Sequence, residues 1–229
     1  MDFQDLVDTP QKVKTLAGTL VFLVAFPVYF EVLPSLIGDD ISGGGSSGLS
    51  GSLTVSFEES TTSLSESVTL GDGDSHDSFF DISTETQALS IGYVELEVAC
   101  FDNDDPGPGF TDTVEGVSDL IDVEGYASGH IEDQSADGSC SGGGNGGFSI
   151  RWDITPNYTG EDYTEEDLNE NDIRQLWDAE GRGVGSWIAT ITASIEAAPV
   201  AGGLIDNDED FDITWTVVFF ELSIEAASS

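Results

Sequence analysis

Positive charge is the scarcest property of this chain, which has 5 Lys and Arg residues against 45 Asp and Glu in 229 residues. No lysine follows Lys14, and the arginines are Arg151, Arg174 and Arg182. The formal net charge is -40, and no basic cluster is present to replace counterions along a phosphate backbone. Nucleic acid is therefore excluded as a partner. The same charge repels anionic lipid headgroups, so membrane contact is expected from an apolar segment alone.

Imidazole bases are also few, since His76 and His130 are the two histidines of the chain. Neither lies near a turn that would present a nucleophile. The Gly44–Gly48 match to G-x-S-x-G lies in a Gly/Ser stretch and lacks the strand-to-helix context of a nucleophile elbow. We therefore expect no enzymatic activity and assign no catalytic residue.

Two cysteines, Cys100 and Cys140, complete the short inventory of reactive side chains. An even number of cysteines in a compartment outside the cell favours a disulfide, with free thiols or metal ligands as the alternatives. A bridge between them would close a loop of about forty residues and stabilise the fold by roughly 4 kcal/mol on the chain-entropy model.

One long apolar run stands at the N-terminal end of the sequence, from Leu16 to Ile37. About twenty residues cross a bilayer as a helix, so we predict a cytoplasmic stub at 1–14 and a transmembrane signal anchor at 15–38. Lys12 and Lys14 precede the run, which places the C-terminal domain outside the cell membrane in a single-pass topology. A cleaved signal peptide is the alternative, but small residues of a cleavage site do not follow the run.

Glu31 is the acidic residue of this membrane-length segment. Ionisable groups in membranes often mark contacts with partners, so Glu31 is a candidate membrane contact. The alternative, which we prefer, is a position at the outer interface, where the flanking Pro27 and Pro34 kink the helix end.

For the remainder of the chain, the composition predicts a Gly/Ser linker at 39–51 and a domain at 52–229. From Ser52 onward apolar and polar residues alternate, most regularly over Ala88–Phe101, and 13 Phe with 4 Trp supply a core. The predicted fold is all-β, an antiparallel β-sandwich of the jelly-roll or Ig-like kind. One short inserted helix is predicted over 165–181, with Asp167 as its cap.

Acidic turns recur along the domain, and one of them follows Cys100. Its residues Asp102, Asn103, Asp104 and Asp105 offer the oxygen ligands that calcium prefers. Similar clusters occupy 71–77 and 206–210. The alternative is that Asp and Asn merely stabilise turns in a very acidic chain. Calcium is thus the one possible cofactor, and none is required by the sequence.

Asn157 begins an Asn-Tyr-Thr sequon on a predicted turn, so it is a candidate N-glycosylation site of an external domain. The acidic, lysine-poor surface is typical of halophilic archaeal proteins, since molar salt screens self-repulsion.

Three stretches near the C-terminus carry a family resemblance: FSIRWDITPNYTG, GSWIATITASIEAA and IDNDEDFDITWTVVFFE. They resemble the last strands of secreted β-sandwich domains of archaeal surface proteins, including the jelly-roll P-domain and the pre-peptidase C-terminal domain. The resemblance covers the last third to half of the domain and implies fold and surface display. It transfers no ligand site.

These observations favour a membrane-anchored extracellular β-sandwich that acts as a non-enzymatic structural or interaction protein in adhesion or envelope architecture. An exposed strand edge or the acidic loops would contact protein partners. One alternative is an accessory subunit of a larger envelope complex, such as pilus-like or archaellum-like machinery. Another is a calcium-dependent carbohydrate-binding module.

Overall fold

The computed structural model describes residues 48–83, 89–101, 111–140, 146–196 and 208–227. The predicted stub and anchor, with Glu31, lie outside these ranges, as do Asp102, Asn103, Asp104 and Asp105. Within the described ranges no helix has the length and apolar character needed to cross a membrane. The chain divides into two compact units, Met1–Gly48 and Leu49–Ser229, and the description below concerns the second.

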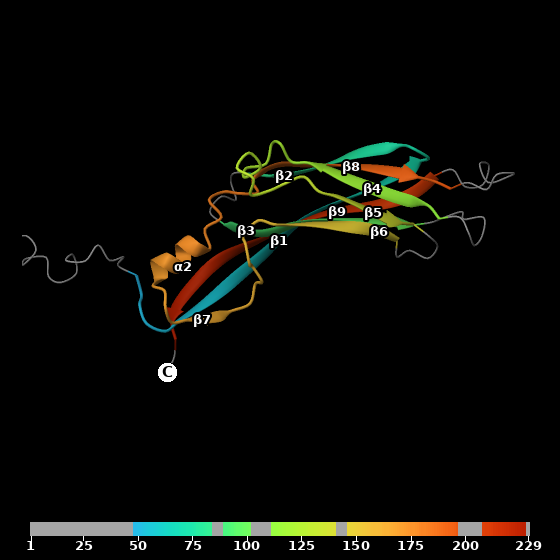
Figure 1. Cartoon of the computed structure of the whole chain (residues 1–229). Helices are drawn as coiled ribbons and strands as arrows, with labels where there is room; N and C mark the ends of the chain where they lie inside the picture. The colour runs from blue at the N-terminus through green and yellow to red at the C-terminus, as the bar shows by residue number, and fades with distance from the viewer. Residues whose placement is uncertain (1–47, 84–88, 102–110, 141–145, 197–207, 228–229) are drawn as a thin grey trace, which may run out of the picture. The chain divides into compact units, whose positions relative to one another are not determined.

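Two antiparallel sheets make up this unit (Figure 1). The larger sheet has the strand order β6-β3-β9-β1-β7, and the smaller has the order β2-β8-β4-β5. The strands are β1 (Leu53–Gly71), β2 (Ser75–Ile82), β3 (Ser90–Phe101), β4 (Thr113–Asp119), β5 (Ser135–Ser139), β6 (Gly146–Asp153), β7 (Tyr163–Glu165), β8 (Gly185–Ser194) and β9 (Asp208–Ala226). The predicted antiparallel β-sandwich is confirmed.

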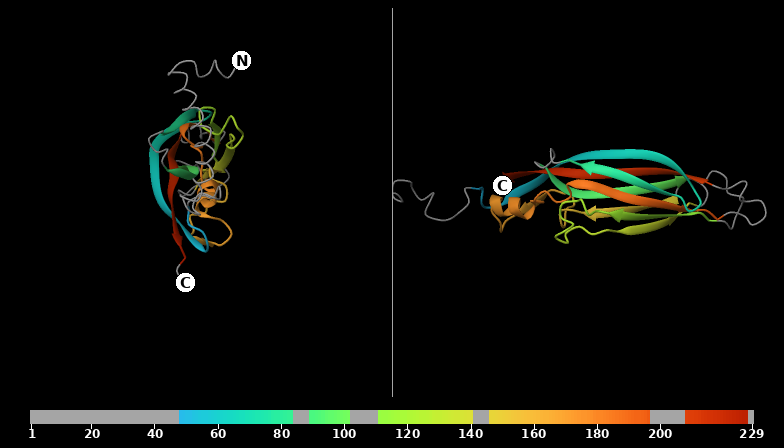
Figure 2. Two further views of the ribbon diagram at one scale, coloured as in Figure 1. Left: turned by 90° about the vertical axis from the view of Figure 1, so that its left-hand side faces the viewer. Right: turned by 90° about the horizontal axis from the view of Figure 1, so that it is seen from above.

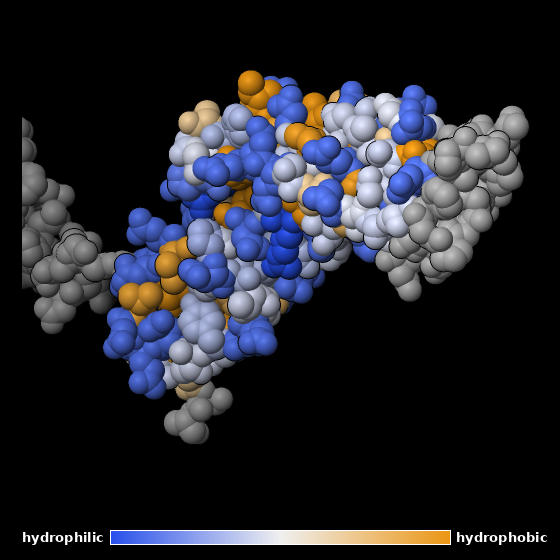
Figure 3. Space-filling model, turned by 45° about the vertical axis from the view of Figure 1, so that its right-hand side comes forward, coloured by the Kyte–Doolittle hydropathy of each residue, from blue (hydrophilic) through white to orange (hydrophobic). Residues whose placement is uncertain are grey.

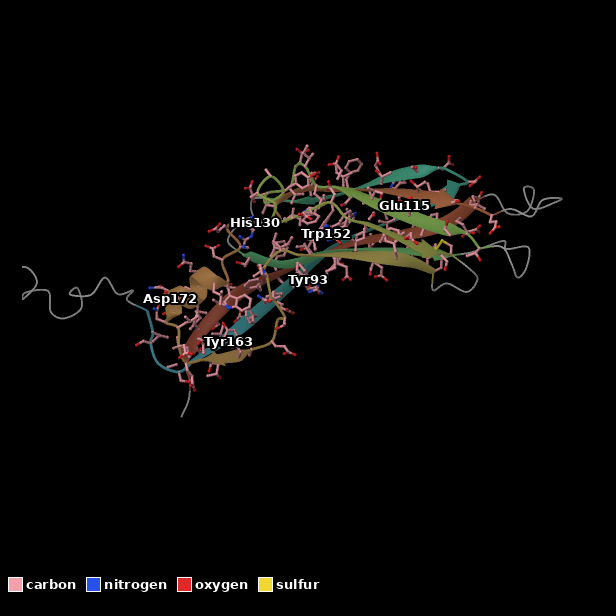
Figure 4. All side chains as sticks on the ribbon, viewed as in Figure 1. Tyr93, Glu115, His130, Trp152, Tyr163 and Asp172 are labelled. Atoms are coloured by element: carbon pink, nitrogen blue, oxygen red, sulfur yellow. A yellow bond between two sulfur atoms is a disulfide. The ribbon has the colours of Figure 1, made fainter. Side chains whose placement is uncertain are left out.

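The main core lies between the two sheets and is built around three tryptophans. Trp152, Trp187 and Trp215 are almost fully buried, and the Trp152 ring lies 5.2 Å from Trp187 and 6.0 Å from Trp215 between centroids. Each comes from a strand whose apolar residues alternate with polar ones, which places one apolar face of each sheet inward. Figure 4 shows Trp152 at this level of the sandwich.

The disulfide between Cys100 and Cys140 is present, as the sequence predicts. Cys100 belongs to β3 of the larger sheet, and Cys140 directly follows β5 of the smaller sheet. Both side chains are buried, and their Cα atoms are 5.4 Å apart. The bridge therefore ties the two layers together at one end of the sandwich (Figure 4).

A second core lies on the opposite face of the longest strand pair. The four successive residues Val217 to Phe220 of β9 are all buried. Val217 and Phe219 belong to the main core, whereas Val218 and Phe220 pack with Tyr158. Successive strand residues point to opposite faces, so a run of four buried residues means that β9 is covered on both sides here.

The chain between β6 and β8 provides this outer cover. It contains β7, which pairs with the first residues of β1, and the short helix α2 (Glu170–Leu176). Ile173 of α2 is fully buried with Leu53, Val55 and Ile224. The views in Figure 2 show α2 beside the paired ends of β1 and β9.

The helix prediction is correct in place but wrong in extent and cap. Asn169, and not Asp167, caps α2, because its side chain accepts hydrogen bonds from the N–H groups of Asn171 and Asp172. Glu165 belongs to β7 instead, where main-chain pairing with β1 holds the backbone extended. Leu176 is 60% exposed, so it does not share the buried face with Ile173.

Replacing both cysteines by alanine should lower the free energy of unfolding by up to about 4 kcal/mol, because the closed loop spans 40 residues. Urea denaturation of the double variant and the wild type measures this difference. Equal midpoints and slopes would contradict a structural role for the bridge.

Candidate functional site

Strand β1 has a long edge without a main-chain partner among the described residues. β1 pairs with β9 from Leu53 to Gly71 without a shift of register. On its other side it pairs with β7 over Leu53 to Val55 alone. Figure 1 shows β1 extending well beyond the short β7. The stretch beyond Val55 is the candidate site, and we call its part from Glu59 to Thr69 the β1 edge.

Two aspartates mark the ends of the β1 edge and show which main-chain groups face outward. The N–H of Phe57 donates to Asp162 Oδ1 at 3.3 Å, and the N–H of Gly71 donates to Asp74 Oδ2 at 3.2 Å. In an antiparallel pair alternate residues bond to the same neighbour, so residues with the parity of Phe57 and Gly71 point away from β9. Those between the two ends are Glu59, Thr61, Ser63, Ser65, Ser67 and Thr69.

The middle of the β1 edge is open on both faces of the sheet as well. Every residue from Glu58 to Ser65 is exposed, including Leu64 at 45%. Natural edge strands are commonly blunted by lysine, proline or a bulge. β1 contains none of these three devices, and its register with β9 is unbroken; its charged side chains are Glu58, Glu59 and Glu66, of which Glu59 and Glu66 bond to Tyr158 and Ser78. The edge is thus competent to accept another strand.

A ladder of hydroxyl groups occupies the outer face beside the edge. Ser63 and Ser65 hydrogen bond to the hydroxyls of Thr216 and Thr214 at 3.1 and 3.0 Å. Farther along, Ser67 and Thr69 donate at 2.6 Å to carboxylates of β9, Asp212 and Asp210 respectively. These cross-strand contacts fix the rotamers of the small side chains, which lowers the entropy lost when a partner binds.

On the inner face, the structure brings together three residues that the sequence did not connect. Ser78 of β2 donates to Glu66 of β1, and His76 Nε2 lies 3.3 Å from the other carboxylate oxygen of Glu66. The Ser78 hydroxyl is fully buried and accepts a hydrogen bond from Trp215 Nε1 at 2.9 Å. The cluster joins β1 to β2 beside the tryptophan core.

The other end of the β1 edge rests on the second core. The hydroxyl of Tyr158 donates to Glu59 Oε1 at 2.6 Å, and its ring stacks on Phe220 with centroids 4.5 Å apart. Burial of Tyr158, with the Glu59 carboxylate beside it, raises the pKa of its phenol well above the ordinary value. Phe57 packs edge-on against Tyr158 and Trp177.

The described acidic turns use their carboxylates to hold the backbone. Asp72 accepts from the N–H of Ile195 at 3.1 Å, and buried Asp112 accepts from the N–H of Glu196 at 2.6 Å. The predicted acidic turn at 206–210 is wrong in its second half, because β9 begins at Asp208. Among the residues that the structure describes, no group of three or more His, Cys, Asp or Glu side chains is arranged to hold a metal ion. The calcium site at Asp102, Asn103, Asp104 and Asp105 stays a prediction.

Asn157 lies in the exposed turn that follows β6. Its φ of 62° is the left-handed conformation that asparagine tolerates better than most residues. Glycosylation of Asn157 stays a prediction. Figure 3 shows a face on which hydrophilic residues predominate, with apolar residues in small separate groups.

Comparison with known proteins finds similar folds among solved structures and no match in sequence. No family model matches the chain, and no curated protein matches it. Similar solved structures include the decameric BFDV capsid protein, with 11% identity, a TM-score of 0.33, and coverage of 71% of this chain and 98% of that one. Desmodium yellow mottle tymovirus (11% identity, TM-score 0.25, 75% and 93% covered) and Cocksfoot mottle virus (11%, 0.27, 86% and 94%) are also similar. Likenesses at these TM-scores carry no argument about function.

The buried Tyr158 phenol gives the unit a measurable alkaline sensitivity. Because the folded state raises the pKa of Tyr158, its contribution to stability is complete below the unfolded pKa of about 10 and is lost as the pH rises above it. Tyr158→Phe should flatten the fall in unfolding free energy between pH of about 9 and 11. Urea titrations of wild type and Tyr158→Phe at each pH check this. Parallel curves for wild type and Tyr158→Phe would contradict it.

Proposed function

We propose that this chain is a non-enzymatic structural or interaction protein, displayed outside the cell by the segment 15–38, and that the β1 edge is its contact surface. The observation that carries the proposal is the run of outward main-chain groups between the Asp162 and Asp74 contacts. A partner strand laid along this run gains main-chain hydrogen bonds at every second residue.

Four features support display outside the cell. The disulfide Cys100–Cys140 is typical of proteins in oxidising compartments. Asn157 of the sequon is exposed. The last strands resemble those of archaeal surface domains, which also favours display outside the cell. The acidic composition suits a surface exposed to high salt.

The charge of the chain narrows the class of partner. With a net charge of -40, association with another acidic surface depends on screening by salt. Main-chain hydrogen bonds carry no net charge, so a strand edge allows contact without requiring opposite charges on the partner. Specificity then comes from the alternating side chains of the edge.

A photoreactive residue in place of Ser65, in the full chain and in its source cells, tests the proposal. We expect covalent adducts with protein at this position after illumination, because Ser65 lies at the middle of the β1 edge. The matched control is Ser149 of β6, which is also exposed but lies at the opposite edge of the larger sheet. Adducts that are absent at Ser65, or equally abundant at Ser149, would overturn the β1 edge as the contact surface.

A further inference from the structure

We propose that the β1 edge pairs with the β1 edge of a second copy of this chain, antiparallel, with Leu64 of both copies on the two-fold axis. The inference rests on the proposed function of this edge as a contact surface and names its partner. The result would be a two-fold dimer in which the larger sheets of both copies form one continuous sheet.

The ends of the edge select this register. Phe57 and Gly71 already use their outward N–H groups on Asp162 and Asp74, so pairing has to fit between them. Leu64 lies midway between Phe57 and Gly71. An antiparallel pair centred on Leu64 therefore places the free stretch of one copy against the whole free stretch of the other. Any shift along the strand leaves outward groups of one end without partners.

The alternation of outward and inward main-chain groups along β1 is compatible with a pair centred on Leu64. Outward residues must face outward residues, since only these have main-chain groups to exchange. Centred on Leu64, Ser63 faces Ser65 of the second copy, Thr61 faces Ser67, and Glu59 faces Thr69. The two Leu64 residues then form a pair without mutual main-chain bonds, the type in which side chains approach most closely.

The side chains are complementary in this register despite the acidity of the chain. Glu58 faces Leu70 of the second copy, and Glu66 faces Thr62, so no carboxylate stands directly opposite another. On the outer face, the hydroxyls of Thr61, Ser63, Ser65 and Ser67 meet one another, a favourable class of cross-strand pair. On the inner face, the exposed side chain of Leu64 is buried against its own copy.

Salt should control the pairing. Two copies with a net charge of -40 each repel one another in dilute buffer. At about 1 M salt the screening length falls to ~3 Å, which removes the repulsion between distant charges and leaves the main-chain bonds at the edge. Dimerisation is therefore expected at molar salt and suppressed in dilute buffer.

Single cysteines along β1 test the register. The native cysteines are joined to each other, so an introduced cysteine is the one thiol of the chain. In the full chain, in detergent and molar KCl, Leu64→Cys should oxidise to a disulfide-linked dimer. Thr62→Cys is the matched control, because the two copies of residue 62 would lie about 13 Å apart along the strands. Non-reducing gels quantify both, and a dimer yield no higher at 64 than at 62, 63 or 65 would overturn the proposal.

A proline at Ser65 tests the main-chain bonds themselves. In the Leu64→Cys background, Ser65→Pro removes an outward N–H that has no partner within the described chain, so the monomer should stay folded. Two intermolecular bonds are lost per dimer, and the dimer yield at limiting protein concentration should fall at least about tenfold. Ser65→Ala also removes the hydroxyl contact with Thr214 and the hydroxyl pair with Ser63 of the second copy but keeps the N–H, so its dimer yield should fall much less than that of Ser65→Pro.

Circular dichroism of the monomers in dilute buffer confirms that both variants are folded. Equal dimer yields for folded Ser65→Pro and Ser65→Ala would overturn pairing through the edge. The outcome also separates the two proposals. Adducts at Ser65 with a different protein, without a Leu64→Cys dimer, would retain the β1 edge as a contact surface and overturn self-pairing.

Discussion

The uninterrupted pairing of β1 with β9 positions every other part of this unit. Its register runs from Leu53 opposite Ala226 to Gly71 opposite Asp208. One face of the pair covers the tryptophan core of the sandwich, and the other face, toward one end, covers the smaller core around Ile173 and Tyr158. Because both cores use alternate residues of the same two strands, a slip of one residue would expose both at once. The register is therefore fixed by burial on two sides.

This arrangement also leaves an edge with main-chain groups and small hydroxyl side chains. β9 is central and is paired on both sides, by β1 and by β3. β1 lies outside it, and β7 is too short to cover more than its first residues. On the far side of the sandwich, by contrast, Gln134 Nε2 donates to the carbonyl of Arg151 in β6, so that side is partly closed by side chains. In the described part of the chain, β1 therefore offers a long edge on which another strand can be added.

Local sequence patterns were sufficient for the sandwich and the tryptophan core, because alternation in β3, β6, β8 and β9 reports directly which face is buried. The disulfide was predicted from the even number of cysteines in a domain placed outside the cell. Local patterns failed where tertiary contacts decide. Glu165 lies in helix-like sequence but pairs with β1, and Asn169 caps α2 four residues beyond the start of that pattern. The sequence predicted that an exposed strand edge would be a contact surface, but it did not indicate which strand. Which strand is at the edge depends on strand order, and the capping contacts of Asp162 and Asp74 join residues whose neighbours in sequence give no signal of them.

Amide hydrogen exchange along β1, resolved by residue in dilute buffer, measures the central claim most directly. The amides of Thr61, Ser63, Ser65 and Ser67 should exchange rapidly, whereas those of Thr62, Leu64 and Glu66, which bond to β9, should be strongly protected. Alternation of fast and slow exchange would show an edge that is free and in register. Uniform protection of all these amides would mean that another segment already covers the edge, and uniform fast exchange would mean that β1 is not paired with β9 as described.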